Sequence, residues 1–123
     1  MTELVLCADD DEDILALVTL RLRRAGFDVV TAADGEEAVR VARERRPALA
    51  VLDVMMPKQT GYEVLAALRD DETLREVKVI LLSARVQESD VARGIDAGAD
   101  AYLPKPFKAQ ELVAKVEELL APT

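Results

Sequence analysis

The sequence contains no histidine and no tryptophan, and its aromatic residues are limited to two tyrosines and two phenylalanines. Without histidine the chain has no Ser–His or Cys–His nucleophile pair and lacks the usual zinc ligand. The single cysteine, Cys7, has no partner for an intrachain disulfide, and its apolar surroundings indicate a buried thiol in a reducing compartment. Any chemistry must therefore use carboxylates, an amine, hydroxyls or a metal ion.

Long hydrophobic runs are also missing. No apolar stretch approaches the ~18 residues that a membrane span needs, and Leu4–Ala8 is too short for the core of a signal peptide. Lys and Arg number 16 against 24 Asp and Glu, which gives a formal net charge of −8. Such an acidic chain is repelled by nucleic acid backbones. The sequence predicts a cytoplasmic protein that binds neither membranes nor, through this segment, nucleic acid.

With 123 residues, half of them hydrophobic and a third charged, the chain has the size and composition of one folded domain. It shows no internal repeat and no linker-like segment. We therefore expect a single domain over residues 1–123, with its last helix ending near residue 120 and no output domain.

Short apolar segments alternate with amphipathic helical patterns. The strand-like segments are Leu4–Ala8, Asp28–Ala32, Leu49–Asp53, Lys78–Ser83 and Ala101–Leu103. The helical patterns run from Ile14 to Ala25, from the capping residue Asp34 to Pro47, onward from the capping residue Thr60, from Ser89 to Ala97, and from Ala109 to Leu120. Strands this apolar belong in a parallel sheet with helices on both faces. The predicted fold is α/β: a doubly wound five-stranded parallel sheet of order 2-1-3-4-5, a flavodoxin-like (βα)5 three-layer sandwich.

Ligands of such sheets bind at the carboxyl ends of the strands, where Asp9, Asp10, Asp53 and Ser83 all fall. Carboxylates about 5 Å apart repel by roughly 3 kcal/mol per pair at an effective dielectric near 20. Mg²⁺, with Mn²⁺ as the alternative, would compensate this repulsion through oxygen ligands. Asp10 and Asp53 are the expected direct ligands, Asp9 binds directly or through water, and the Met55 carbonyl adds another oxygen.

Asp53 is the candidate nucleophile, which would accept a phosphoryl group as an aspartyl phosphate. Lys105 would pair with one phosphoryl oxygen and the Ser83 hydroxyl would donate to another. Each residue alone has a structural explanation: acids favour a helix N-terminus, Asp53 fits a strand-ending turn, and Lys105 fits a solvated surface amine. Their joint placement at one sheet edge favours the site. A cis bond before Pro106 would aim Lys105 inward.

The ordered set of motifs resembles the receiver domain of bacterial two-component response regulators, with chemotaxis-type single-domain regulators nearest in size. The resemblance spans Leu4 to Leu120. The motifs that carry it are Asp9-Asp10, Asp53 with Met56-Pro57 and Gly61, Ser83-Ala84, and Gly98-Ala99-Asp100-Ala101-Tyr102-Leu103-Pro104-Lys105-Pro106-Phe107.

The resemblance implies that Asp53 accepts phosphate from a phosphohistidine on a sensor histidine kinase or phosphotransfer protein. It implies Mg²⁺ held by Asp9, Asp10, Asp53 and the Met55 carbonyl, and a cis Lys105–Pro106 bond. It also implies a switch in which Ser83 moves toward the phosphoryl group and Tyr102 rotates inward. The surface of the fourth helix, fifth strand and fifth helix would then change its affinity for a downstream protein or an output domain.

Two neighbours of the implied site bear on the phosphoryl lifetime. Met55 lies two residues after Asp53, and Arg85 lies two residues after Ser83, so both flank the expected path of the hydrolytic water. We expect a slow to intermediate lifetime. The final helix lacks a Ser or Asp cap at Lys108, which leaves its first turn weakly specified.

Two other functions fit parts of this pattern. A Mg²⁺-dependent phosphohydrolase of the haloacid dehalogenase type needs a second Asp where this chain has Met55, and it needs a cap domain. A pure interaction scaffold would have no use for an acidic pocket that costs stability. The expected protein is therefore no enzyme proper but a signalling phosphoacceptor that assists its own phosphorylation and dephosphorylation. It is a monomer or a phosphorylation-dependent homodimer, with Asp96, Asp100, Lys108 and Glu111 as candidate charge partners.

Overall fold

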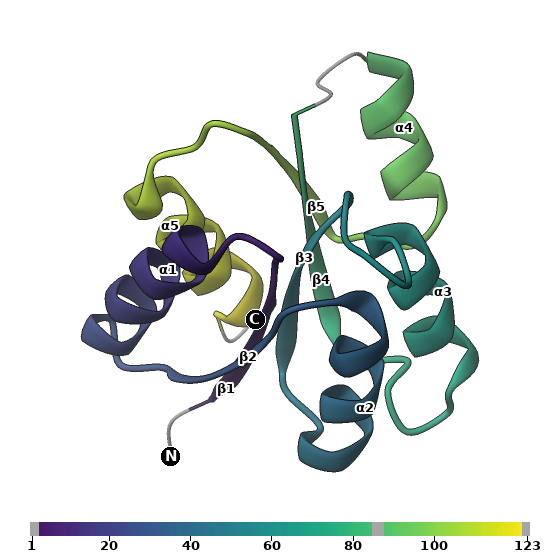
Figure 1. The fold of residues 1–123 in the computed structure, drawn as a ribbon, viewed down its shortest axis with the longest axis horizontal. Helices are drawn as coiled ribbons and strands as arrows, with labels where there is room; N and C mark the ends of the chain where they lie inside the picture. Colours follow the sequence, from purple (N-terminus) through teal and green to yellow (C-terminus); the bar gives the residue numbers. More distant parts are fainter. Residues whose placement is uncertain (1–2, 85–87, 122–123) are drawn as a thin grey trace.

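The protein folds into a central parallel sheet covered by helices on both faces (Figure 1). The computed structural model describes residues 3–84 and 88–121. The five strands pair in the order β2-β1-β3-β4-β5, and all four strand pairs are parallel. The strands are β1 (Leu4–Ala8), β2 (Asp28–Ala32), β3 (Leu49–Asp53), β4 (Lys78–Ser83) and β5 (Ala101–Pro104). The helices are α1 (Glu12–Arg24), α2 (Gly35–Arg45), α3 (Gly61–Asp70), α4 (Glu88–Asp96) and α5 (Ala109–Leu120). The predicted fold class and strand order are confirmed.

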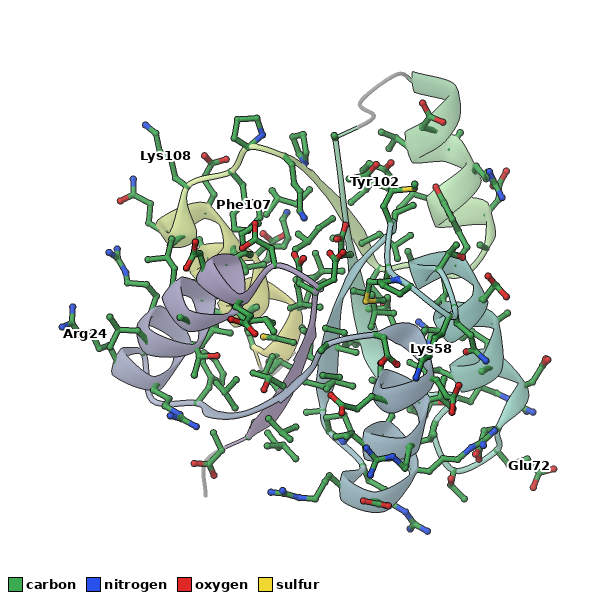
Figure 2. The ribbon with its side chains drawn as sticks, viewed as in Figure 1. Arg24, Lys58, Glu72, Tyr102, Phe107 and Lys108 are labelled. Atoms are coloured by element: carbon green, nitrogen blue, oxygen red, sulfur yellow. The ribbon has the colours of Figure 1, made fainter. Side chains whose placement is uncertain are left out.

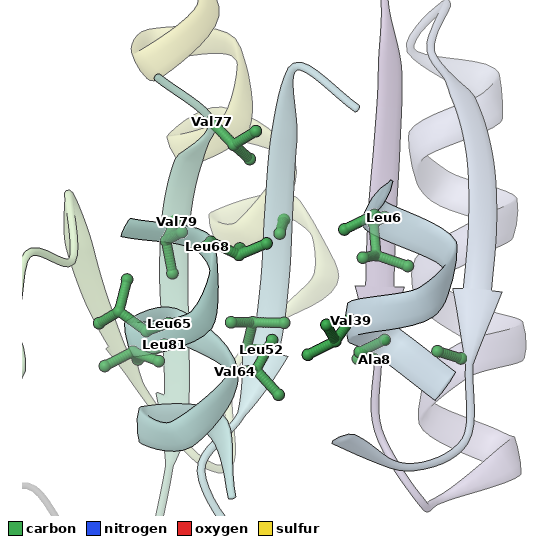
Figure 3. Packing of buried hydrophobic residues seen from close by; sticks show 14 of the residues in the cluster. Leu6, Ala8, Val39, Leu52, Val64, Leu65, Leu68, Val77, Val79 and Leu81 are labelled. Carbon is green, nitrogen blue, oxygen red and sulfur yellow. The ribbon is translucent and has the colours of Figure 1, made fainter. Parts of the chain in front are cut away.

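The alternation of side chains along each strand divides the core into two halves. In β1, Leu6 and Ala8 pack on the side of α2 and α3, whereas Val5 and Cys7 pack on the side of α1 and α5. Figure 3 shows the first half, in which strand residues such as Leu6 and Leu52 meet helix residues such as Leu65. Because both faces are covered, every residue of β3 is buried. The two packed layers hold the carboxyl ends of the strands in fixed register.

Polar side chains fix where three of the helices begin. Asp11 caps α1 by accepting hydrogen bonds from the backbone N–H groups of Asp13 and Ile14 at 2.9 and 3.2 Å. Thr60 caps α3 in a reciprocal capping box with Glu63. The cap at Asp11 places the start of α1 two residues before the predicted Ile14, because the first turn is acidic and lies outside the apolar stripe.

Other differences from the predicted boundaries are small. The fourth helix spans Glu88–Asp96 and the fifth strand extends one residue further, to Pro104. The last helix begins at Ala109 as predicted, although Lys108 supplies no side-chain cap. Instead the Glu111 carboxylate accepts the Lys108 backbone N–H at 3.2 Å, which satisfies one donor of the first turn. Among the described residues, no helix combines the length and apolar character needed to cross a bilayer.

Candidate functional site

Side chains from four strand ends converge at the carboxyl edge of the sheet. Asp9 follows the last residue of β1, Asp53 is the last residue of β3, Ser83 is the last residue of β4, and Lys105 follows the last residue of β5. Asp9, Asp53 and Ser83 are the buried polar residues of the described chain, with exposed fractions of 2, 4 and 3%. Polar groups buried together at one edge need partners there, and Lys105 is the shared partner of the two acids.

Lys105 is the cation of this cluster. Its Nζ lies 3.0 Å from Asp9 Oδ2 and 3.2 Å from Asp53 Oδ2, so one ammonium joins two buried carboxylates. The remaining carboxylate oxygens accept from the backbone: Asp9 Oδ1 accepts the Asp11 N–H at 3.0 Å, and Asp53 Oδ1 accepts the Met55 N–H at 3.3 Å. The backbone N–H of Lys105 donates to the Ser83 carbonyl at 2.7 Å, which fixes the loop after β5 to the end of β4.

One ammonium does not neutralise the cluster. Burial and the negative charge of Asp9 raise the pKa of Asp53 to about 6, although Lys105 and the hydrogen bond from Met55 act in the opposite direction. Partial burial disfavours the charged form of Lys105, but its hydrogen bond to Asp9 and the charges of Asp53 and Asp9 outweigh burial and raise its pKa. Lys105 therefore stays protonated, while the site retains an excess of negative charge.

The excess charge has the chemistry of a divalent cation site. Carboxylate oxygens of Asp9, Asp10 and Asp53 all lie within 4.8 Å of one another. Asp10 is exposed to solvent, whereas the other two acids are buried. Oxygen donors with an open side suit Mg²⁺, which keeps several of its own waters. The donor set therefore fits this ion. The third acid of the run, Asp11, is the cap of α1.

Two close backbone approaches shape the loop between β3 and α3. A Cβ added to Gly61 would lie 2.6 Å from the Asp53 carbonyl oxygen, and one added to Gly35 would lie 2.6 Å from the Gln59 Cβ. The Gly61 N–H donates to the Val54 carbonyl at 3.0 Å. Because both glycines lack a side chain, the loop folds tightly over the end of β3 and carries Met55, whose side chain is 71% exposed, beside the acids.

Ser83 and Tyr102 border a cavity of about 200 Å³ between the sheet edge and α4. Figure 2 shows Tyr102 on the α4 side of the sheet and Phe107 on the α1 and α5 side. Tyr102 is half-buried, and a Cβ added to Gly94 of α4 would lie 2.9 Å from its ring. The two predicted switch residues therefore share one cavity next to the acidic cluster.

The structure bears on several other predictions. The Lys105–Pro106 peptide bond is cis, as predicted. Arg85, expected beside the hydrolytic water, falls outside the described residues. Of the four candidate charge partners for a dimer, Asp100 is already engaged within the chain: its Oδ2 pairs with Arg69 at 3.2 Å and accepts the Val79 N–H at 2.8 Å. Asp100 thus has partners within its own chain, and its role as a charge partner in a dimer stays a prediction.

The sequence patterns do not predict the contacts of some residues near the site. Tyr62 of α3 lies under α4, where the Arg93 guanidinium stacks over its ring at 4.4 Å from the centroid. The Tyr62 hydroxyl donates to the Asp90 carbonyl at 3.4 Å. Arg69, at the end of α3, donates to the Gly98 carbonyl through Nε and Nη2 at 3.1 and 2.7 Å. For the Tyr62 contacts the sequence signal is the scarcity of aromatic residues, which makes each tyrosine conspicuous, whereas the sequence pattern does not single out Arg69.

Comparisons with known proteins agree with this geometry. Residues 5–117 match the family model described as "Response regulator receiver domain". The transcriptional regulatory protein PrrA of Mycobacterium tuberculosis is 50% identical over 116 residues, which cover 94% of this chain and 49% of that protein. The chain spans about half the length of the curated relatives it matches.

Solved structures give the same result. Chemotaxis response regulator CheY4 of Vibrio cholerae superposes with a TM-score of 0.92 at 32% identity, covering 98% of this chain and all of that one. The BeF3-activated receiver domain of DrrB, an OmpR/PhoB homologue from Thermotoga maritima, has a TM-score of 0.88 at 34% identity, covering 99% and 100% of the two chains. The family match over most of the chain, the strand order and the acidic edge agree, and the chain belongs to the receiver domains of two-component response regulators.

Proposed function

We propose that this domain accepts a phosphoryl group on Asp53 from a phosphohistidine of a sensor histidine kinase or phosphotransfer protein, in a Mg²⁺-dependent reaction. The observation that carries the proposal is the position of Lys105 Nζ, 3.0 Å from Asp9 and 3.2 Å from Asp53, at an edge where three carboxylates gather within 4.8 Å. A strand-ending turn or a helix cap needs no buried pair of acids around one cation.

Asp9, Asp10 and Asp53 would hold the Mg²⁺, and the Met55 carbonyl is proposed as a further ligand. When bound, the ion would supply positive charge to the phosphoryl oxygens and reduce the repulsion between the acids. Asp53 has the lone pair for nucleophilic attack: its carboxylate oxygen forms the bond to phosphorus, the phosphorus–nitrogen bond of the donor breaks, and the imidazole nitrogen keeps that electron pair.

The remaining residues would orient the transferred group. Lys105 is charged and lies within 3.2 Å of the nucleophile, so its ammonium is placed to pair with a phosphoryl oxygen. Ser83 is buried at the adjacent strand end, and its hydroxyl is proposed to donate to a second phosphoryl oxygen. In this scheme Ser83 moves toward Asp53, Tyr102 turns into the cavity that both residues border, and the α4–β5–α5 surface changes.

The proposed output is a change in affinity for a downstream protein or an output domain. PrrA of Mycobacterium tuberculosis is named a transcriptional regulatory protein, and this chain matches about half of it. With a net charge of −8, the segment itself is poorly suited to nucleic acid. We propose that it acts in the cytoplasm as a single-domain phosphoacceptor unit over residues 1–123, as a monomer or a phosphorylation-dependent homodimer. It assists its own phosphorylation and dephosphorylation and turns over no separate substrate.

Intact mass after incubation with acetyl phosphate and Mg²⁺ tests this proposal. We expect the wild type to gain the mass of one phosphoryl group only when the metal is present, and the gain to disappear in Asp53→Ala. Lys115→Gln, which removes a partly exposed lysine of α5, should be phosphorylated like the wild type. If neither acetyl phosphate nor beryllofluoride modifies the wild type, the acidic site has no phosphoacceptor activity and the scaffold function takes its place.

A further inference from the structure

α4 is held to the rest of the domain by few side chains. Among its described positions only Gly94 is buried, and Ala92, Arg93, Ile95 and Asp96 are exposed. A helix with so little buried surface has a low free energy of local opening. Its position therefore depends on a small number of individual contacts, which the structure identifies in the middle of the helix and just after its C-terminal end.

The first contact lies under the middle of the helix, between Asp90 and Arg93. Tyr62 of α3 places its ring 4.4 Å from the Arg93 guanidinium and donates its hydroxyl to the Asp90 carbonyl at 3.4 Å. Both interactions depend on the same side chain, and both reach α4 across the space between two helices. The Tyr62 ring thus supports one turn of α4 through a cation–π contact and a hydrogen bond.

The second contact lies at the C-terminal end. Arg69 donates two hydrogen bonds to the Gly98 carbonyl and a third, at 2.7 Å, to the Val77 carbonyl. Its guanidinium also pairs with Asp100 at 3.2 Å. Several hydrogen bonds from one planar guanidinium fix the turn between α4 and β5 to the end of α3. The turn after α4 is therefore held by more hydrogen bonds than the part of the helix that Tyr62 contacts.

Tyr62 is also connected to the phosphoacceptor site. It borders the same cavity of about 200 Å³ as Ser83, Tyr102 and Met55. Burial and the neighbouring Tyr102, which lines the same cavity, raise the pKa of Tyr62. A movement of Tyr102 within this cavity would therefore act directly on the side chain that supports α4.

We propose that Tyr62 is a positioning residue of the phosphorylation switch. It holds the middle of α4 against α3 through Asp90 and Arg93, and changes at Ser83 and Tyr102 release it, so that α4 moves about the turn anchored by Arg69. The coupling to phosphorylation rests on the proposed function, whereas the support of α4 by Tyr62 does not. By linkage, a variant that has already lost this support binds a phosphoryl analogue more tightly.

Hydrogen exchange of α4 without any ligand tests the support itself. Tyr62→Ala should speed exchange of the amides of α4 by about fivefold, the loss expected for one cation–π contact and one hydrogen bond. Tyr62→Phe keeps the ring under Arg93 and should show a smaller increase. Phe27→Leu is the matched control, because Phe27 is a partly buried aromatic packed on the α1 and α5 side. An unchanged rate in Tyr62→Ala, or the same increase in Phe27→Leu, would overturn the proposal.

Titration with beryllofluoride and Mg²⁺ tests the coupling. The chain has no tryptophan and only the two tyrosines at this cavity, so its tyrosine emission reports this site alone. We expect Tyr62→Ala, followed by the emission of Tyr102, to bind beryllofluoride about fivefold or more tighter than the wild type, and Phe27→Leu to bind it like the wild type. Equal or weaker binding in Tyr62→Ala contradicts the coupling. If the wild type fails to bind beryllofluoride, the proposed function fails, while the exchange result still decides whether Tyr62 supports α4.

Discussion

The ammonium of Lys105 lies 3.2 Å from the carboxylate of Asp53, although β4 separates the strands that carry them. Lys105 leaves the end of β5, and its backbone N–H is tied to the Ser83 carbonyl at the end of β4. The side chain can therefore reach across the end of β4 to the end of β3. Lys105 therefore forms one ion-paired cluster with Asp9 and Asp53, although these residues lie far apart in the sequence.

Replacing Lys105 tests the contribution of this ion-paired cluster to stability. In Lys105→Met, the carboxylates of Asp9 and Asp53 remain buried without their cation. We expect the free energy of unfolding in metal-free buffer to fall by about 2–3 kcal/mol, because removal of one partner leaves buried charge unpaired. Urea denaturation measures this loss. Added Mg²⁺ should recover part of it, since the acids then regain a counter-ion.

The control for this variant is another lysine in an ion pair. Lys115 pairs with Glu118 at 3.2 Å on the exposed face of α5. Exposed pairs of this kind contribute at most about 0.5 kcal/mol, so Lys115→Gln should leave the denaturation midpoint almost unchanged. A loss of equal size in both variants would contradict the role assigned to Lys105.

The raised pKa of Asp53 predicts a pH-dependent stability. An acid with a higher pKa in the folded state, about 6 here, binds its proton more tightly when folded. Its contribution to stability is therefore complete below about pH 4, the ordinary value for aspartate, and is lost as the pH rises through 6. Asp53→Asn does not titrate at this position. Its melting temperature should exceed that of the wild type by about 4 °C at pH 7, with a smaller difference at pH 4.

Thermal melting at several pH values without metal measures this difference. Mg²⁺ at pH 7 should narrow the difference, because the ion stabilises the ionised wild-type site and has one ligand fewer in the variant. A melting difference that does not change between pH 4 and pH 7 would show that Asp53 titrates normally.

The sequence was sufficient to predict the sheet and the acidic cluster because both follow from local patterns. Short apolar segments between helices impose a parallel sheet, and the chirality of the crossovers leaves few strand orders. Once the order is known, residues at strand ends such as Asp9 and Asp53 must be neighbours. The start of α1 was predicted two residues late, because an apolar stripe does not reveal a first turn made of Glu12 and Asp13.

The contacts of α4 could not be obtained in this way. The stacking of Arg93 on Tyr62 and the bonds from Arg69 to Gly98 join residues that are far apart in the chain. Helical periodicity defines which face of a helix is apolar, but it does not define which side chain of a neighbouring helix lies opposite. Exposed polar positions such as Arg93 follow no periodic pattern, so their partners emerge only from the packed structure.

Arg69 should make a large contribution to stability for a partly exposed residue. Its guanidinium donates to the Arg75, Val77 and Gly98 carbonyls and to Asp100. Arg69→Ala removes all of these hydrogen bonds, and we expect a loss of about 2 kcal/mol in urea denaturation. Arg43→Ala, which removes an exposed arginine with one ion pair at 3.6 Å, is the control and should cost less than about 0.5 kcal/mol. Equal losses in the two variants would contradict the anchoring role of Arg69.

Substitution of Gly61 tests a steric requirement for glycine, whereas substitution of Gly26 tests a requirement of backbone conformation. A Cβ at this position would lie 2.6 Å from the Asp53 carbonyl oxygen, a backbone atom at the end of a buried strand that cannot move cheaply. Gly61→Ala should therefore destabilise the fold by about 2–3 kcal/mol and disturb the Asp53 carboxylate.

Gly26 has a φ of 99° but no atom within 4 Å of an added Cβ, so Gly26→Ala carries only a left-handed backbone cost of about 1–2 kcal/mol. Because Gly26 lies in the turn before β2, away from the acids, its variant should keep wild-type phosphorylation by acetyl phosphate. Slower phosphorylation in Gly61→Ala alone would show that this glycine is needed for the geometry of the site. Wild-type rates in both variants would mean that the loop after β3 can shift without moving Asp53.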